Sequence, residues 1–235
     1  MSEQERKAYW AEHFSRQHAD AALSGTDKLD FSNDRVRTQT YGWVLEAAGT
    51  LRGRRCLDAG CGTGEIAALL AASGAQVDAF DIAPAAIAAL QRQQPGIRWF
   101  VGDAGEFATE QIAEAYDLIV SSEVLQYVDA TRAIMRMWDH VAPGGRLMVV
   151  IPFAGCPIVQ SVRDRFDGHY QGITLSAVEQ LAGKLANVER VFWRGATFLE
   201  DQTLLPYGLG PWRDTFHPPA KPPNRLQIVF LRTAA

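Results

Sequence analysis

The sequence predicts an α/β fold in which a largely parallel sheet is covered by helices on both faces. Short apolar segments alternate with helix-forming segments from about residue 54 onward, which is the pattern of βαβ units. A glycine-rich loop follows the first of these apolar segments. The chain has 235 residues, a length that suits one large α/β domain. Crossovers between parallel strands in such a fold are right-handed.

The leader and the first half of the core alternate regularly. We expect a helix from residue 35 onward, with Asn33 or Asp34 as its N-cap. Strands and helices then follow in turn, the strands being richer in β-branched and aromatic residues. The expected segments are 54–59, 65–74, 76–82, 84–94, 97–102, 116–122, 131–141 and 146–152.

The carboxyl third has a different pattern. A helix is expected within residues 175–186, with Ser176 and Glu179 spaced as a capping box. Strands follow at residues 188–194 and 225–232. Because the Pro- and Gly-rich stretch between them forms no helical crossover, these two strands are expected to pair as an antiparallel hairpin.

Composition excludes several classes of protein. The 23 basic and 27 acidic residues give a net charge of −4, which argues against a nucleic-acid-binding protein. No apolar run reaches the roughly 20 residues that a membrane span needs, and the charged amino terminus does not resemble a secretory signal. The three cysteines form no CxxC pair. We therefore predict a cytoplasmic protein with no metal site and no membrane or nucleic-acid partner.

The most informative segment is CLDAGCGTGE at residues 56–65. An apolar strand ends at Asp58, and glycines follow at positions 60, 62 and 64 before a helix begins near Glu65. A loop of this kind lets a nucleotide-like ligand approach the backbone closely. The dinucleotide pattern G-x-G-x-x-G fails, because Glu65 stands where the third glycine belongs.

Asp81 is the second candidate ligand-binding residue. It ends the strand at residues 76–82, and open α/β sheets bind ligands at the carboxyl ends of their strands. A carboxylate there can accept hydrogen bonds from two ribose hydroxyls. A solvated loop acid is the alternative interpretation.

The segment CLDAGCGTGEIAALLAASGAQVDAFDIAP resembles the first two motifs of class I S-adenosylmethionine-dependent methyltransferases. GDA at 102–104, YDLIVSSEVLQYV at 116–128, APGGRLMVVIP at 142–152 and GHYQGITLSAVEQL at 168–181 resemble the later motifs, in the family's order. The resemblance covers about residues 54–195 and favours the small-molecule branch that includes quinone-biosynthesis enzymes.

The resemblance implies a Rossmann-like sheet of seven strands, mostly parallel, with an antiparallel last strand and a helical amino-terminal lid. It implies one domain over residues 1–235. Its parts would be a leader or lid at 1–50, a cofactor-binding core at 51–195, an insertion helping to form the acceptor pocket at 196–224, and the last strand at 225–235.

The resemblance also implies a cofactor site for S-adenosylmethionine, whose product is S-adenosylhomocysteine. Asp81 would hold the ribose, Ile82 and Asp103 would meet the adenine, and Asp58 would order the loop. Arg37, like Arg35, could reach the methionine carboxylate, although a solvated helix face is the slightly favoured explanation. The full expected set is Asp58, Gly60, Cys61, Gly62, Gly64, Asp81, Ile82, Asp103, Ala104, Ser121 and Arg37.

Methyl transfer from a sulfonium depends mainly on positioning the two reactants. A base is needed only when the acceptor must lose a proton. His169 is the first candidate base, because a histidine titrates near pH 7. Tyr127 and Glu123 follow the fourth strand and are further candidate catalytic groups, although Glu123 could instead cap the next helix.

Aromatic residues in the leader and the insertion are expected to line an apolar acceptor site, although many of them would serve the core instead. The candidate acceptor-binding residues are Trp10, Phe14, His13, Tyr127, Tyr207 and Trp212.

The sequence thus predicts an enzyme that methylates a small molecule, with a hydroxyl acceptor favoured, in specialised-metabolite, quinone-like or sugar biosynthesis. N- or S-methylation of a small amine, amino acid or thioether is the first alternative. The alternative of another class is a non-catalytic protein that binds S-adenosylmethionine as a sensor or partner. We expect a monomer or homodimer.

Overall fold

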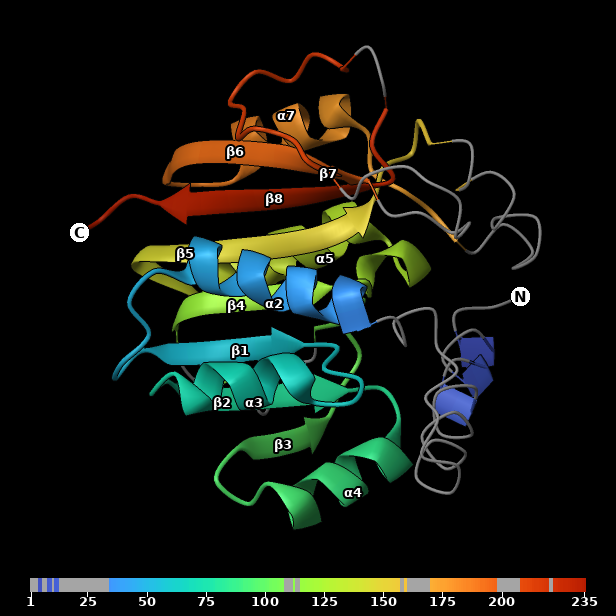
Figure 1. Ribbon diagram of the computed structural model, residues 1–235, viewed down its shortest axis with the longest axis vertical. Helices are drawn as coiled ribbons and strands as arrows, with labels where there is room; N and C mark the ends of the chain where they lie inside the picture. Colours follow the sequence, from blue (N-terminus) through green and yellow to red (C-terminus); the bar gives the residue numbers. More distant parts are fainter. Residues whose placement is uncertain are drawn as a thin grey trace. The chain divides into compact units, whose positions relative to one another are not determined.

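The computed structural model describes residues 4–5, 8–9, 11–12, 34–107, 112, 115–156, 159, 170–197, 208–219 and 222–235 (Figure 1). For residues 34–40, 196–197 and 208–209 it describes the backbone. The described chain forms two compact units, Met1–Tyr116 and Asp117–Ala235. Most of the predicted lid, and the middle of the predicted insertion, lie outside the described residues.

The first unit is built of parallel strands and the helices that connect them. Its strand order is β3-β2-β1, and both neighbouring pairs are parallel. Helix α3 lies beside β1 and β2, helix α4 lies beside β2 and β3, and α2 lies beside α3 (Figure 1). The elements are α2 (Asp34–Ala48), β1 (Arg55–Ala59), α3 (Glu65–Ala72), β2 (Gln76–Asp81), α4 (Pro84–Gln93) and β3 (Arg98–Val101). All six were predicted from the sequence.

Gly64 sets how closely the elements of this unit pack. A Cβ at this position would stand 2.7 Å from Leu90 of α4 and 2.8 Å from Trp99 of β3. Its backbone also adopts a positive φ of 77°, which residues with a side chain rarely take. Glycine is therefore required here for packing as well as for the turn into α3.

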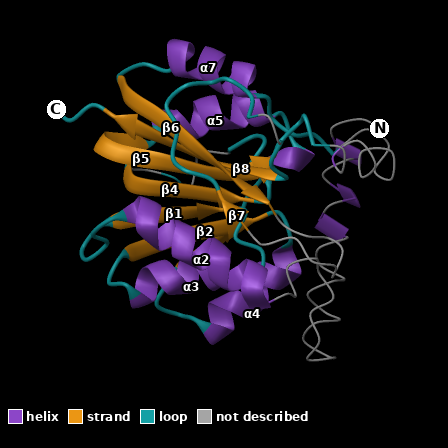
Figure 2. Cartoon of the chain, turned by 45° about the horizontal axis from the view of Figure 1, so that its top comes forward, coloured by secondary structure: helices purple, strands orange, loops and turns teal. Residues whose placement is uncertain are grey.

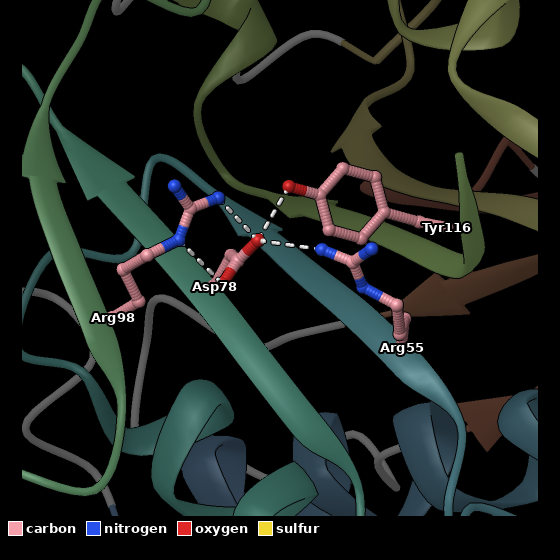
Figure 3. Close-up of polar contacts among 4 residues, drawn as sticks. All are labelled: Arg55, Asp78, Arg98 and Tyr116. Atoms are coloured by element: carbon pink, nitrogen blue, oxygen red, sulfur yellow. Dashed lines mark hydrogen bonds and ion pairs between the residues drawn. The ribbon is translucent and has the colours of Figure 1, made fainter. Parts of the chain in front are cut away.

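A charged cluster ties together the amino-terminal ends of the strands (Figure 3). Asp78 of β2 accepts hydrogen bonds from Arg98 of β3, at 2.6 and 2.9 Å, and from the hydroxyl of Tyr116 at 2.6 Å. Arg55 of β1 lies 3.8 Å from the same carboxylate. Burial alone would raise the pKa of Asp78, but these hydrogen bonds and cations lower it below its usual value. The cluster lies at the edge opposite the glycine loop, so its role is structural.

Asp78→Asn is predicted to lower the free energy of unfolding at pH 7 by about 1–2 kcal/mol, since Arg98 is half exposed and solvent screens the pair. Because folding lowers this pKa, the ionised carboxylate stabilises the protein above the unfolded value of about 3.9. The deficit of the variant should therefore shrink as the pH falls below about 4. Urea unfolding at pH 7 and near pH 3 measures this, with Asp214→Asn as an exposed control. A deficit that does not change with pH would contradict the assignment.

The second unit is a mixed sheet with the strand order β4-β5-β8-β6-β7. Strand β8 lies between β5 and β6 and is antiparallel to both, as predicted for the last strand. The two-residue β7 adds a short pairing at the edge of β6. The elements are β4 (Tyr116–Ser122, whose first residue ends the first unit), the 3-10 helix η2 (Leu125–Tyr127), α5 (Ala130–Asp139), β5 (Val141–Pro152), α7 (Leu175–Lys184), β6 (Val188–Thr197), β7 (Gly208–Leu209) and β8 (Arg225–Arg232).

Helices α5 and α7 lie side by side against this sheet (Figure 2). Trp138 of α5 is 2% exposed, packs edge-on against Phe230 of β8, and donates a hydrogen bond of 2.8 Å to the carbonyl of Ala186. The buried side chain of Trp138 thus links α5, β8 and the segment after α7.

Two sequence predictions about this unit were wrong in detail. The hydroxyl of Thr174, not Ser176, caps α7 by accepting a hydrogen bond of 3.1 Å from Ala177. Helix α7 begins at Leu175, so Ser176 lies inside the first turn. Strand β5 begins at Val141, earlier than expected, because the Pro-Gly-Gly segment continues the strand. Within the described part of the chain, no helix is long and apolar enough to span a bilayer.

Candidate cofactor and acceptor sites

The glycine loop leaves β1 in a conformation that requires glycine. Gly60, Gly62 and Gly64 have φ values of 83°, 52° and 77°, in the left-handed region where a Cβ is strained. The amides of Gly60 and Cys61 both donate to the carbonyl of Phe80 at 2.9 Å. Since Ala59 pairs with Phe80 in the sheet, the loop lies directly beside the carboxyl end of β2.

The side chain of Asp81 links the glycine loop to the end of β2 by hydrogen bonds. Its Oδ2 accepts a hydrogen bond of 2.9 Å from the amide of Gly62, and its Oδ1 accepts one of 3.0 Å from the amide of Ala83. The residue is 7% exposed. An ionised carboxyl can accept several hydrogen bonds at once, so the bonds to these two amides are compatible with ligand binding at the same group.

Asp58 orders the same loop by linking the end of β1 to α3. The residue is 1% exposed, and its Oδ2 accepts a hydrogen bond of 3.0 Å from the amide of Ala67 in α3. Burial raises the pKa of Asp58 to about 7, with the charge of Asp81 adding to the effect and the Ala67 bond opposing it. The loop therefore lies beside two buried carboxyl groups, of which Asp58 is partly protonated near neutral pH.

The other residues predicted for the cofactor in this unit lie close to Asp81. The amide of Gly102 donates to the carbonyl of Asp81 at 3.0 Å, which places Asp103 and Ala104 at the end of the neighbouring strand. Asp103 accepts a hydrogen bond of 2.7 Å from the amide of Gly105. Ile82 is partly exposed, so its side chain is available to a flat ring.

A hydrogen bond links the leader helix α2 to the start of α3, next to the glycine loop. The hydroxyl of Tyr41 in α2 donates to the carboxylate of Glu65, the first residue of α3. Arg37 lies in α2, but the structure describes its backbone alone. The predicted contact of Arg37 with the cofactor stays a prediction.

A polar cluster follows β4 in the second unit. Glu123 has a positive φ of 57°, unusual for a residue with a side chain, and its side chain is 5% exposed. Its carboxylate accepts a hydrogen bond of 2.8 Å from the Nε of Arg225 and one of 3.3 Å from the amide of Gln126. Burial raises the pKa of Glu123, and the charge of Arg225 opposes this rise.

Tyr127 lies beside this cluster on an apolar wall. Its ring is half buried and packs edge-on against Tyr170 at 5.7 Å between ring centres. Cys156 and Val159 complete the buried cluster. Ser121, predicted to contact the cofactor through its backbone, is the second-last residue of β4 and is fully buried.

The remaining candidates divide into two groups. Trp212 is in contact with Arg194, whose guanidinium lies 4.2 Å from the ring centre, and with Phe192. Packing therefore accounts for its position, and its predicted role in acceptor binding is untested. The other candidates lie outside the described residues: His169, Trp10, Phe14, His13 and Tyr207.

Comparison with known proteins agrees with the geometry of the first unit. Residues 57–147 match a family model described as a methyltransferase domain. This segment is therefore similar to a methyltransferase domain. The match begins within β1, includes the glycine loop and Asp81, and ends in β5. It confirms the resemblance to class I methyltransferases that the motifs predict.

A curated relative of the methyltransferase domain is the ubiquinone biosynthesis O-methyltransferase of Bordetella bronchiseptica. It is 37% identical over 109 residues, which cover 44% of this chain and 45% of that protein. The chain thus spans about half the length of the curated relatives that it matches first.

Solved structures confirm the fold that the sequence predicts for this chain. The magnesium protoporphyrin IX methyltransferase ChlM of Synechocystis PCC 6803, with bound S-adenosylhomocysteine, superimposes with a TM-score of 0.65 at 17% identity, covering 97% of this chain and 100% of that one. The N-methyltransferase NodS of Bradyrhizobium japonicum WM9, in complex with S-adenosylhomocysteine, gives 0.60 at 23% identity, covering 94% and 97%.

Sequence reasoning missed two residues of the polar cluster that follows β4. Gln126 stands three residues after Glu123, a spacing that brings side chains together on one helical turn and could have drawn attention to it. Arg225 is 102 residues away in the chain, and no local pattern connects it with Glu123.

Arg225→Met is predicted to destabilise the protein by roughly 3 kcal/mol at pH 8, because it leaves Glu123 buried without its cation. At pH 5 the loss should be smaller. Burial already raises the pKa of Glu123, so the variant's carboxyl can take up a proton as the pH falls. Arg190→Met is the matched control, since the Arg190–Asp214 pair is exposed and should contribute little. Thermal unfolding at both pH values measures the effect; equal losses in the two variants would contradict it.

Proposed function

We propose that this protein transfers the methyl group of S-adenosylmethionine to a small-molecule acceptor, with a hydroxyl as the accepting group. The sulfonium of the cofactor supplies an already activated methyl group. The chain's own task is to bind the cofactor, to orient the acceptor and to exclude water.

The hydrogen bonding of the glycine loop carries the proposal. The amides of Gly60, Cys61, Gly62 and Gly64 all donate to acceptors within the protein, at 2.8–2.9 Å. In dinucleotide-binding loops, backbone amides point together at a phosphate. These four amides are bonded within the protein instead. A nucleoside cofactor that carries no phosphate fits this arrangement.

The space around the loop fits the adenosine and methionine parts of this cofactor. A Cβ at Gly62 would meet nothing within 4 Å, so the backbone there faces open space. We assign the ribose hydroxyls to Asp81, the adenine to Ile82, Asp103 and Ala104, and the methionine end to the loop. Arg37 and the backbone of Ser121 are proposed for the methionine carboxylate and amine.

A hydroxyl acceptor is favoured by the name of the first curated relatives, O-methyltransferases. The names of structural neighbours include an N-methyltransferase, but at 23% identity this likeness concerns the fold. In the proposed arrangement His169 takes the proton of the hydroxyl, Tyr127 helps to position the acceptor, and residues 1–50 and 196–224 enclose it. Glu123 is proposed to contribute on the acceptor side by ordering the segment after β4 through its ion pair with Arg225.

A two-stage experiment tests the function. Calorimetry with S-adenosylmethionine and S-adenosylhomocysteine should give micromolar affinity for both. Transfer of a labelled methyl group is then followed with a panel of phenols, sugars and amines. Label on a phenol or sugar supports the proposal, and label on amines alone would correct the acceptor atom. Binding without any transfer would favour a sensor, and no binding would refute the cofactor assignment.

Gly62→Ala is predicted to weaken cofactor binding at least tenfold, because the new methyl group enters the space assigned to the ligand. Gly53→Ala is a closely matched control. Gly53 also has a positive φ, 74°, and open space around its Cα, but it lies in the turn before β1. Both variants should lose about 1 kcal/mol of stability from backbone strain. Calorimetry and thermal unfolding separate the two effects; equal affinities would exclude the loop from the site.

Asp81→Asn is predicted to weaken cofactor binding about tenfold or more, since charged hydrogen bonds to the ribose are lost. Asp78→Asn, three residues earlier on the same strand, should lower stability and leave this affinity within twofold. Calorimetric titration of both variants with S-adenosylhomocysteine tests the contrast. An unchanged affinity in Asp81→Asn would remove Asp81 from the ribose site.

A further inference from the structure

One buried acceptor atom near the carboxyl end of β4 is left without a donor. Among the residues that the structure describes, none donates a hydrogen bond to Oε1 of Gln126, although the residue is only 2% exposed. A buried carbonyl without a partner is unfavourable by about 1–3 kcal/mol. Such atoms are rare in native proteins, and each one calls for an explanation.

The orientation of the Gln126 amide is fixed by its neighbours. Its Nε2 donates to Oε2 of Glu123 at 3.3 Å, and Oε1 of Glu123 accepts from Arg225 at 2.8 Å. Because the ion-paired carboxylate can only accept, the amide must present its nitrogen to Glu123 and direct Oε1 elsewhere. The backbone is also held, since the carbonyl of Gln126 accepts a hydrogen bond of 2.8 Å from Gln171.

An apolar and aromatic cluster begins at the residue after Gln126. The next residue, Tyr127, is half buried on the apolar wall formed with Tyr170, Cys156 and Val159. Ligand sites combine apolar and aromatic walls with a few oriented polar groups. The cluster follows the carboxyl end of β4, the edge at which open α/β sheets bind ligands.

We propose that Oε1 of Gln126 accepts a hydrogen bond from a hydroxyl or N–H group of the methyl acceptor, and so selects acceptors that carry such a donor. This inference rests on the proposed function and assigns a specificity residue to it. An acceptor without the donor would leave Oε1 buried and unpaired, which is how protein sites reject analogues that lack one polar group. Glu123 and Arg225 serve as positioning residues, because they hold the amide in this orientation.

The test compares ligands that differ in one donor group, with the protein saturated by S-adenosylhomocysteine. The probe pairs are phenol and anisole, catechol and 1,2-dimethoxybenzene, and aniline and N,N-dimethylaniline. The wild-type protein should bind the donor-bearing member of at least one pair at least tenfold more tightly. In Gln126→Met this ratio should fall to within twofold, with the affinity for S-adenosylhomocysteine unchanged.

Two further variants keep the result interpretable. Gln126→Leu repeats the loss of the acceptor atom with a different apolar side chain, in case one replacement packs poorly. Gln180→Met makes the same substitution at an exposed position of α7 and should keep the wild-type ratio. A ratio that persists in both Gln126 variants reflects size alone and overturns the inference, as does a wild-type protein that distinguishes no pair. Failure to bind S-adenosylhomocysteine would instead overturn the proposed function itself.

Discussion

The Asp81 carboxylate is the contact on which the candidate cofactor site depends. It accepts hydrogen bonds from the amides of Gly62 and Ala83, and so joins the glycine loop after β1 to the turn after β2. The loop amides can turn inward in this way because its three glycines adopt left-handed conformations. The proposed ribose contact would use the same carboxylate. One side chain would then serve both the structure of the loop and the binding of the ligand.

Carboxylates near the two ends of β2 have different structural roles in the first unit. Asp78, near the amino-terminal end, is paired with Arg98 and bonded to Tyr116, and this network holds neighbouring strands together. Asp81, at the carboxyl end, accepts hydrogen bonds from the amides of Gly62 and Ala83. The second unit has a comparable device in the Glu123–Arg225 pair, which fixes the segment after β4. In each unit, buried charge orders the segment that follows a strand.

The sequence was sufficient for the fold class, the order of the elements and the glycine loop, because alternation and glycine spacing are local signals. It failed at Thr174, since the spacing of Ser176 and Glu179 matches a capping box and only the helix start at Leu175 shows that Thr174 is the N-cap. It named Glu123 but not the reason for its position, because Arg225 reaches it only through the antiparallel β8. Gln126 was missed for a related reason: an unpaired buried atom is visible only when the packing around it is known.

A crystal structure of the complex with S-adenosylhomocysteine tests the central claim most directly. The account predicts that both ribose hydroxyls lie within hydrogen-bond distance of Asp81, that the adenine lies against Ile82, and that Gly62 contacts the ligand through its backbone. It also predicts that the bonds from Gly62 and Ala83 to Asp81 persist. A ligand bound away from Asp81, or a loop that gives up these bonds to bind it, would contradict the account.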